Sequence, residues 1–177
     1  MKHIVFCMAT LLVASVASAT SITGRVVYVD DGDTVVLLDG SNQQVKVRLA
    51  NIDAPETSHT KHETGRIGQP FADRSRQSLD QMVKGKNVIA NCIEQDRYQR
   101  QVCDILVDGV SANTEQVRRG YAWANTANKG RYLRDRSLVE LQERARLARA
   151  GLWADSNPVP PWEWRKRCWT EGQCAAD

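Results

Sequence analysis

Between residues 21 and 52 the sequence alternates short β-rich runs with turn signals. The stretch reads SITGRVVYVDDGDTVVLLDGSNQQVKVRLANI, in which Val, Ile, Tyr and Leu are interrupted by DDGD and DGSNQ. Asp-Gly pairs between such runs are typical of β-hairpin turns. The pattern therefore predicts three antiparallel strands, at about residues 22–29, 33–39 and 43–50.

The next part of the chain predicts three helices and two further strands. FADRSRQSLDQMVKGK places apolar side chains on one helical face, after Pro70 and before Gly85. NVIANCIE and QVCDILVDG are typical of strands, and SANTEQVRRG of a short helix capped by Ser111. YLRDRSLVELQERARLARAG is typical of an amphipathic helix that ends at Gly151. The buried stripe expected for this last helix is Leu138, Leu141, Ala145 and Ala148.

The order of these elements is three strands, a helix, two strands and two helices. Five short strands with a helix between the third and the fourth are what a small Greek-key barrel of the OB type requires. We therefore expect an α+β fold, a five-stranded OB-type Greek-key barrel with three helices. The ending NPVPPWEWRKRCWTEGQC is rich in Pro and Trp, and we expect it to lack regular structure.

The first 19 residues have the layout of a secretory signal peptide, with a basic start, a short apolar run and small residues before Thr20. The apolar run is too short to span a bilayer as a helix. We expect cleavage after Ala19, a barrel domain over residues 20–155 and a Pro/Trp-rich tail over residues 156–177. The mature protein is then exported, periplasmic or secreted, and carries no membrane segment.

The mature chain is mildly basic, because loss of Lys2 leaves 23 of the 24 Lys and Arg against 21 Asp and Glu. The basic residues gather in DRYQRQ, RYLRDR, QERARLARA and WEWRKRCW. Such local surfaces suit a polyanionic partner, although basic helix faces are commonly just solvated.

Four cysteines remain after cleavage, and an even number in an exported chain favours disulfides over metal ligands. Three connectivities are open to them. Cys92 and Cys103 flank a polar turn between two predicted strands, where they would face each other across a hairpin. Cys168 and Cys174 would close a small loop in the tail. The alternative for Cys92 and Cys103 is a pair of buried free thiols.

Charged residues recur at the ends of the predicted strands. Asp33 in the first hairpin and Asp53 after the third strand lie at the ends of neighbouring strands and are expected to meet. Carboxylates of this kind, with carbonyls and water, bind hard cations such as Ca²⁺. Each motif alone is also ordinary turn chemistry. Arg48 and Arg100 favour the cation site over ordinary turn chemistry, because a cation with carboxylates and two guanidiniums is what binding of a phosphodiester needs.

A zinc site is a weaker alternative. His59, His62 and Glu63 lie in a long polar loop, without Cys or further His at a suitable spacing. A solvated loop is the expectation for these residues.

Four motifs, DDGDTVVLL, VRLANIDAPE, DRYQRQVCDILVDG and ANTEQVRRGYAW, resemble the staphylococcal (micrococcal) nuclease family. The resemblance runs from about residue 22 to 153 with the motifs in the family's order and at similar spacing, and the ending resembles exported bacterial members. It implies a Ca²⁺-dependent phosphodiesterase that cuts DNA and RNA at the P–O5′ bond and leaves 3′-phosphates. A preference for single-stranded or frayed regions and a monomeric state are also expected.

The resemblance implies a role for each matching residue. Asp33, Asp53 and the main-chain carbonyl of Ala54 would hold calcium, with Ala54 standing where the family commonly has Thr. Glu56 would activate or orient the attacking water, and Arg48 and Arg100 would contact phosphate. The expected substrate-binding residues are Arg97, Tyr98 and, for the pocket of the family's base-stacking tyrosine, Tyr132. The alternative function is a non-catalytic OB-fold module that binds nucleic acid.

Overall fold

Five strands close a barrel in the computed structural model, which describes residues 20–58 and 66–174. Their order is β1-β2-β3-β6-β5, with antiparallel pairing throughout except for the parallel pair β3–β6, which closes the barrel. The predicted α+β fold with a five-stranded OB-type barrel is confirmed. The bounds of these strands are β1 Thr20–Val29, β2 Thr34–Asp39, β3 Gln44–Leu49, β5 Asn87–Gln95 and β6 Gln101–Val107.

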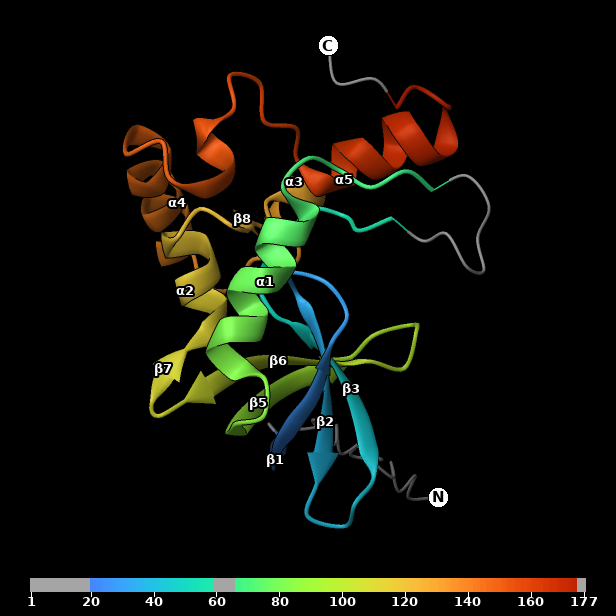
Figure 1. Cartoon of the computed structure of the whole chain (residues 1–177), viewed down its shortest axis with the longest axis vertical. Helices are drawn as coiled ribbons and strands as arrows, with labels where there is room; N and C mark the ends of the chain where they lie inside the picture. The colour runs from blue at the N-terminus through green and yellow to red at the C-terminus, as the bar shows by residue number, and fades with distance from the viewer. Residues whose placement is uncertain (1–19, 59–65, 175–177) are drawn as a thin grey trace, which may run out of the picture.

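Helices gather at one end of the barrel (Figure 1). The longer ones are α1 (Ala72–Val83), α2 (Ala112–Arg118) and α4 (Ser137–Leu147). In the chain, α1 lies between β4 and β5, and it packs against α2 and β1. Short elements complete this region: β4 Ile52–Asp53, β7 Val110–Ser111, β8 Trp123–Ala124, α3 Ala127–Gly130, the 3₁₀ turn η1 Gly151–Ala154, α5 Pro161–Trp164 and the π-helical η2 Arg165–Thr170. No helix in the described part of the chain is both long and apolar enough to cross a bilayer.

The barrel core follows the period of two that strands impose on their side chains. Alternate positions of β1, β2, β3 and β6 point inward and are almost fully buried, which removes their apolar surface from water. The largest of these buried side chains include Val26, Val29, Val35, Leu37, Val47, Leu49 and Ile105.

The boundaries of α1 and α2 agree closely with the sequence patterns, but α4 is shorter than predicted: it begins at Ser137 and ends at Leu147, and Gly151, the expected end, is the first residue of η1. The Ser111 hydroxyl caps α2 by accepting from the Thr114 N–H at 3.1 Å, as expected. In α4, Leu138 and Ala145 are buried and Leu141 is partly buried against the core. Ala148 is exposed, contrary to the expected stripe, because the helix ends at Leu147 and the chain then turns away.

The prediction that the tail lacks regular structure is wrong for residues 161–170. Pro160 is extended and Pro161 is the first residue of α5, a position where proline's fixed φ suits a helix. Trp164 then packs its indole into the protein, with 4% of the residue exposed. Burial of this aromatic ring supplies the stabilisation that the local sequence pattern did not reveal.

Both cysteine pairs proposed from the sequence are joined in the structure. Cys92 and Cys103 are register partners in the antiparallel pair β5–β6 and form a disulfide across it. Cys168 and Cys174 form a second disulfide at the end of the tail. The free-thiol alternative for Cys92 and Cys103 therefore does not apply.

Candidate active site

The acidic residues of two chain segments meet at the helical end of the barrel. Nη2 of Arg48, at the end of β3, donates to Oδ1 of Asp53 at 2.7 Å and to Oδ2 of Asp33 at 3.2 Å. The Asp53 side chain is only 1% exposed and that of Asp33 only 7%. The guanidinium of Arg48 thus binds both Asp33 and Asp53, the two carboxylates that the sequence pattern predicted to lie close together.

Local pairing explains why these side chains converge. Thr34 and Arg48 are register partners in β2–β3, and the Leu49 N–H donates to the Asp33 carbonyl at 2.7 Å. Asp53 is fixed separately, because β4 pairs with β8 through Asp53 and Trp123. The carboxylates are therefore positioned by backbone pairing of two different sheets.

Asp33 has a dense set of donors. Its Oδ2 accepts the Ala54 N–H at 3.1 Å, and its Oδ1 accepts the Thr34 hydroxyl at 3.0 Å. Burial by itself would raise the pKa of Asp33, but the Arg48 guanidinium and then the Ala54 N–H outweigh it and hold that pKa below the usual value. The residue is therefore a carboxylate in this site.

Asp31 behaves in the opposite way. Its Oδ1 accepts the Asp33 N–H at 2.9 Å, which shapes the tight turn between β1 and β2. Burial and the negative charge of Asp33 raise the pKa of Asp31 well above its usual value. The turn thus contains two carboxyl groups whose pKa values are shifted in opposite directions.

Glu56 lies in the loop after β4, and its side chain contacts the guanidinium of Arg165. Burial raises the pKa of Glu56 to about 7, although Arg165 opposes this rise, and the charge of Asp53 adds to it. The Gln69 N–H donates to the Glu56 carbonyl at 2.7 Å and fixes the loop. The guanidinium of Arg165 contacts both Glu56 and Asp53, so Glu56 lies next to the carboxylate that Arg48 also binds.

Arg100 borders the site from the β5–β6 turn. Its Nη2 lies 2.7 Å from Oδ2 of Asp96, which holds the guanidinium in one position, and its positive charge lowers the pKa of Asp33. On the same turn, Arg97 donates to the Tyr98 hydroxyl at 2.8 Å, and the Tyr98 side chain is largely exposed. This turn therefore carries two arginines and an exposed aromatic ring, and Arg100 is the member whose charge acts on Asp33.

Tyr132 does not join this group. It lies between α3 and α4 with 43% exposure, and the Arg131 guanidinium sits 6.0 Å from its ring centroid. Within residues 20–58 and 66–174, no hydrogen bond connects Tyr132 to the acidic residues. The zinc alternative cannot be compared with the structure, since His59, His62 and Glu63 lie outside the described residues.

Three residues of the site were not identified from the sequence. Arg165 reaches the carboxylates from the tail, where it is one of several clustered basic residues. Gln116 in α2 donates to the Gly32 carbonyl at 2.8 Å and so holds the first turn. Gln69 accepts the Glu56 N–H on its side-chain oxygen at 3.4 Å. The WEWRKR cluster was the only signal for any of them.

The donor chemistry of the site suits a hard cation with few protein ligands. In the described part of the chain, no three Asp, Glu, His or Cys side chains are grouped so as to hold a metal. Asp33 and Asp53 do form a buried carboxylate pair, and Ca²⁺ accepts carbonyl and water oxygens for the rest of its shell. A two-carboxylate site therefore fits the residues present.

Comparison with known proteins gives consistent matches. The family model described as staphylococcal nuclease homologue matches residues 46–155. An uncharacterised endonuclease of Haemophilus influenzae is 39% identical over 160 residues, which covers 89% of this chain and 82% of the relative. Protein ParB of Escherichia coli is 38% identical over 90% of this chain and 87% of its own length. A micrococcal nuclease of Shigella flexneri is 34% identical over 89% and 88%, respectively.

Proposed function

The chain belongs to the staphylococcal nuclease homologue family, and on that premise we propose that it is a calcium-dependent nuclease that hydrolyses phosphodiester bonds of DNA and RNA. The observation that carries the proposal is the double contact of Arg48 with Asp33 and Asp53. It brings together anionic ligands for a divalent cation and a guanidinium suited to phosphate.

In this proposal Asp33, Asp53 and the main-chain carbonyl of Ala54 hold Ca²⁺, with water completing its shell. When bound, the ion neutralises phosphate charge and makes an associated water a better nucleophile. Alanine at position 54 is sufficient for the metal contact, because the proposed ligand is the main-chain carbonyl and not the side chain. The hydroxyl of a threonine at this position is not needed for the metal contact.

The remaining roles belong to charged side chains of the same region. Glu56 accepts a proton from the attacking water or orients it, in line with the leaving oxygen. Arg48 and Arg100 contact the phosphate oxygens and offset the charge that grows in the transition state. The bond cut is P–O5′, and the product carries a 3′-phosphate.

Arg97 and Tyr98, on the turn between β5 and β6, bind the substrate next to the cleaved bond. Tyr132 is a further candidate for contact with a base. An exposed aromatic ring beside arginines favours stacking with unpaired bases, which supports a preference for single-stranded or frayed regions. Both disulfides agree with export to the periplasm or the medium, since such bonds persist in oxidising compartments. The protein is expected to act as a monomer.

The deciding experiment incubates the purified protein with single- and double-stranded DNA and with RNA, in calcium or in a calcium chelator. Cutting that requires calcium and leaves 3′-phosphates is the expected result. Nucleic-acid binding without cutting in calcium would instead favour the non-catalytic OB-fold module. Cutting that continues in the chelator would contradict the metal assignment.

A further inference from the structure

Arg165, in the first turn of η2, inserts its guanidinium between the two acidic residues that follow β3. Its Nη2 donates to Oδ2 of Asp53 at 2.7 Å, and its Nη1 donates to Oδ1 of Asp53 at 3.2 Å and also to Oε1 of Glu56. These contacts join residues 112 and 109 positions apart in the chain. A cation from the tail therefore bridges a proposed metal ligand and the proposed base.

Both oxygens of Asp53 accept from arginine guanidiniums. Oδ1 accepts from both Arg48 and Arg165, and Oδ2 accepts from Arg165. A metal ion needs direct access to a carboxylate oxygen at about 2.3–2.6 Å. A cation that binds Asp53 therefore competes with the Arg165 guanidinium for the same two oxygens.

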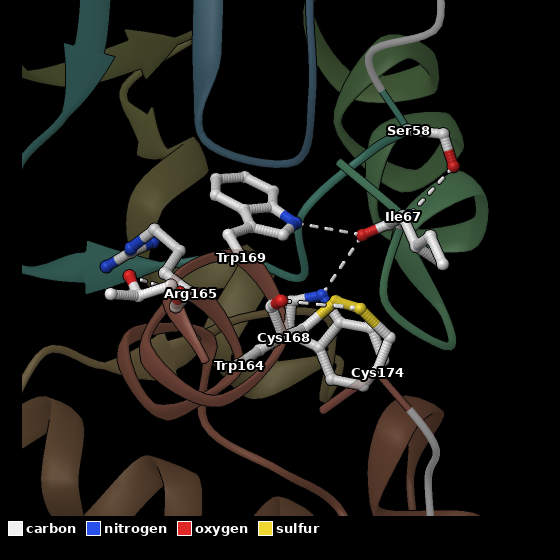
Figure 2. Close-up of a disulfide and its surroundings, with 9 residues drawn as sticks. Ser58, Ile67, Trp164, Arg165, Cys168, Trp169 and Cys174 are labelled. Atoms are coloured by element: carbon white, nitrogen blue, oxygen red, sulfur yellow. Dashed lines mark hydrogen bonds between the residues drawn. A yellow bond between two sulfur atoms is a disulfide. The ribbon is translucent and has the colours of Figure 1, made fainter. Parts of the chain in front are cut away.

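The segment that carries Arg165 is anchored on the loop that supplies Glu56. The indole N–H groups of Trp164 and Trp169 both donate to the Ile67 carbonyl, at 3.2 and 3.0 Å. Figure 2 shows the two indoles converging on this one oxygen beside the Cys168–Cys174 disulfide, with the Arg165 side chain directed away from the disulfide. The segment that carries Arg165 is thus folded and is held against the rest of the protein by these contacts.

Gln69 connects the C-terminal segment to the loop that carries Glu56. Its side-chain oxygen accepts the Glu56 N–H at 3.4 Å, while its side-chain amide donates to the Val159 carbonyl just before α5. Gln69 is itself buried, at 7% exposure. The backbone of Glu56 and the start of the tail are therefore linked through one side chain.

We propose that Arg165 is an intramolecular counter-cation that occupies the Asp53–Glu56 carboxylates and that a divalent cation must displace before it can bind there. The C-terminal segment then closes the site in the metal-free protein. This inference rests on the proposed function, since it concerns the same metal position.

The physical reason lies in the cost of buried charge. Asp53 is almost fully buried, and a buried carboxylate without a compensating cation is strongly destabilising. Arg48 and Arg165 share that compensation, and the Arg165 side chain is the more exposed of the two, at 35% against 17%, so its guanidinium is the one that can move toward water. The apparent affinity for a metal is the intrinsic affinity multiplied by the fraction of molecules in which Arg165 has moved away, so a small fraction means weak binding.

The test is calorimetric titration of calcium into the wild-type protein, Arg165→Gln and Lys166→Gln. Lys166 is the exposed neighbour in the same helix, so its variant makes the same charge change without removing the contact. We expect Arg165→Gln to bind calcium at least about tenfold more tightly and Lys166→Gln to stay within about twofold of wild type. Equal or weaker binding by Arg165→Gln would overturn the inference.

A second variant covers the case in which Arg165→Gln fails to fold. Arg165→Lys keeps the charge, but a single ammonium replaces the forked donor that spans Asp53 and Glu56, so tighter calcium binding than wild type is again expected. Wild-type affinity in a folded Arg165→Lys would count against the inference if Arg165→Gln cannot be measured. Absence of calcium binding in every variant, wild type included, would reject the calcium assignment together with the inference, whereas equal binding in all would reject the inference alone.

Discussion

Gln116 and Gly32 are joined by a buried hydrogen bond between the second helix and the first turn of the barrel. Nε2 of Gln116 donates to the Gly32 carbonyl at 2.8 Å and to the Ser75 carbonyl at 3.1 Å. A Cβ at position 32 would lie 1.8 Å from the Ser75 hydroxyl oxygen, so only glycine fits. The turn that carries Asp33 is thus set by α1 and α2 as well as by its own sequence.

Replacing Gln116 by Met is expected to lower the free energy of unfolding by about 1–3 kcal/mol. The change keeps side-chain volume but leaves the buried Gly32 carbonyl without the Gln116 donor, whereas the Ser75 carbonyl lies within α1 and keeps its helical hydrogen bond. Urea unfolding measures the effect, with Arg118→Met on the exposed side of the same helix as the control. A loss below about 0.5 kcal/mol, the range of surface substitutions, would show that Gln116 does not hold the turn.

Replacing Arg48 by Met is expected to destabilise the protein by about 3–5 kcal/mol, because the buried Asp33 loses its guanidinium partner, whereas Asp53 keeps Arg165. Thermal and urea unfolding measure this change. Arg25→Met, on the exposed side of β1, removes an equal charge and is expected to be nearly neutral. Similar stability of the two variants would contradict the pairing role assigned to Arg48.

Replacing Glu56 by Gln is expected to reduce turnover on single-stranded DNA by about 10²–10⁴-fold, the usual contribution of a general base. Circular dichroism and calcium affinity establish that the variant is folded and still binds metal. Glu143→Gln on α4, where the side chain is 52% exposed, is the matched control. Near-normal turnover in Glu56→Gln would remove this residue from the mechanism.

Replacing Arg100 by Gln is expected to lower kcat by about 10²–10³-fold, the typical cost of one donor to a developing negative charge. Arg100→Lys is expected to recover only part of this loss, since an ammonium lacks the bidentate fork. Steady-state kinetics on a short oligonucleotide separate kcat from KM. An effect confined to KM would indicate that Arg100 contacts the substrate equally before and during the reaction.

Removing the disulfide of the β5–β6 hairpin with the double change Cys92→Ala and Cys103→Ala is expected to cost about 2–3 kcal/mol, given a separation of 11 residues. The comparison is Cys168→Ala with Cys174→Ala, which opens a loop of only 6 residues in the tail. Unfolding in urea under non-reducing conditions gives both values. A hairpin variant as stable as wild type would mean that the strand pairing alone fixes the β5–β6 hairpin.

The sequence alone was sufficient for the barrel and for most of the acidic site. Alternation of apolar residues and Asp-Gly turns are local signals of backbone conformation, and they predicted the five strands within a few residues. Asp33 and Asp53 were expected to meet because they lie at the ends of neighbouring predicted strands, and both contact Arg48 in the structure. The Cys92–Cys103 pair followed from the same hairpin reasoning.

Only the tertiary structure revealed the part played by Arg165, Gln69 and Gln116. Arg165, Lys166 and Arg167 form one basic run, and no local pattern distinguishes the residue that turns inward. That choice depends on how Trp164 and Trp169 pack on a loop about 100 residues earlier, since the indole contacts set which face of η2 meets the carboxylates. Local signals determine the elements of this protein, whereas contacts between distant segments decide which cation compensates the buried acids of its site.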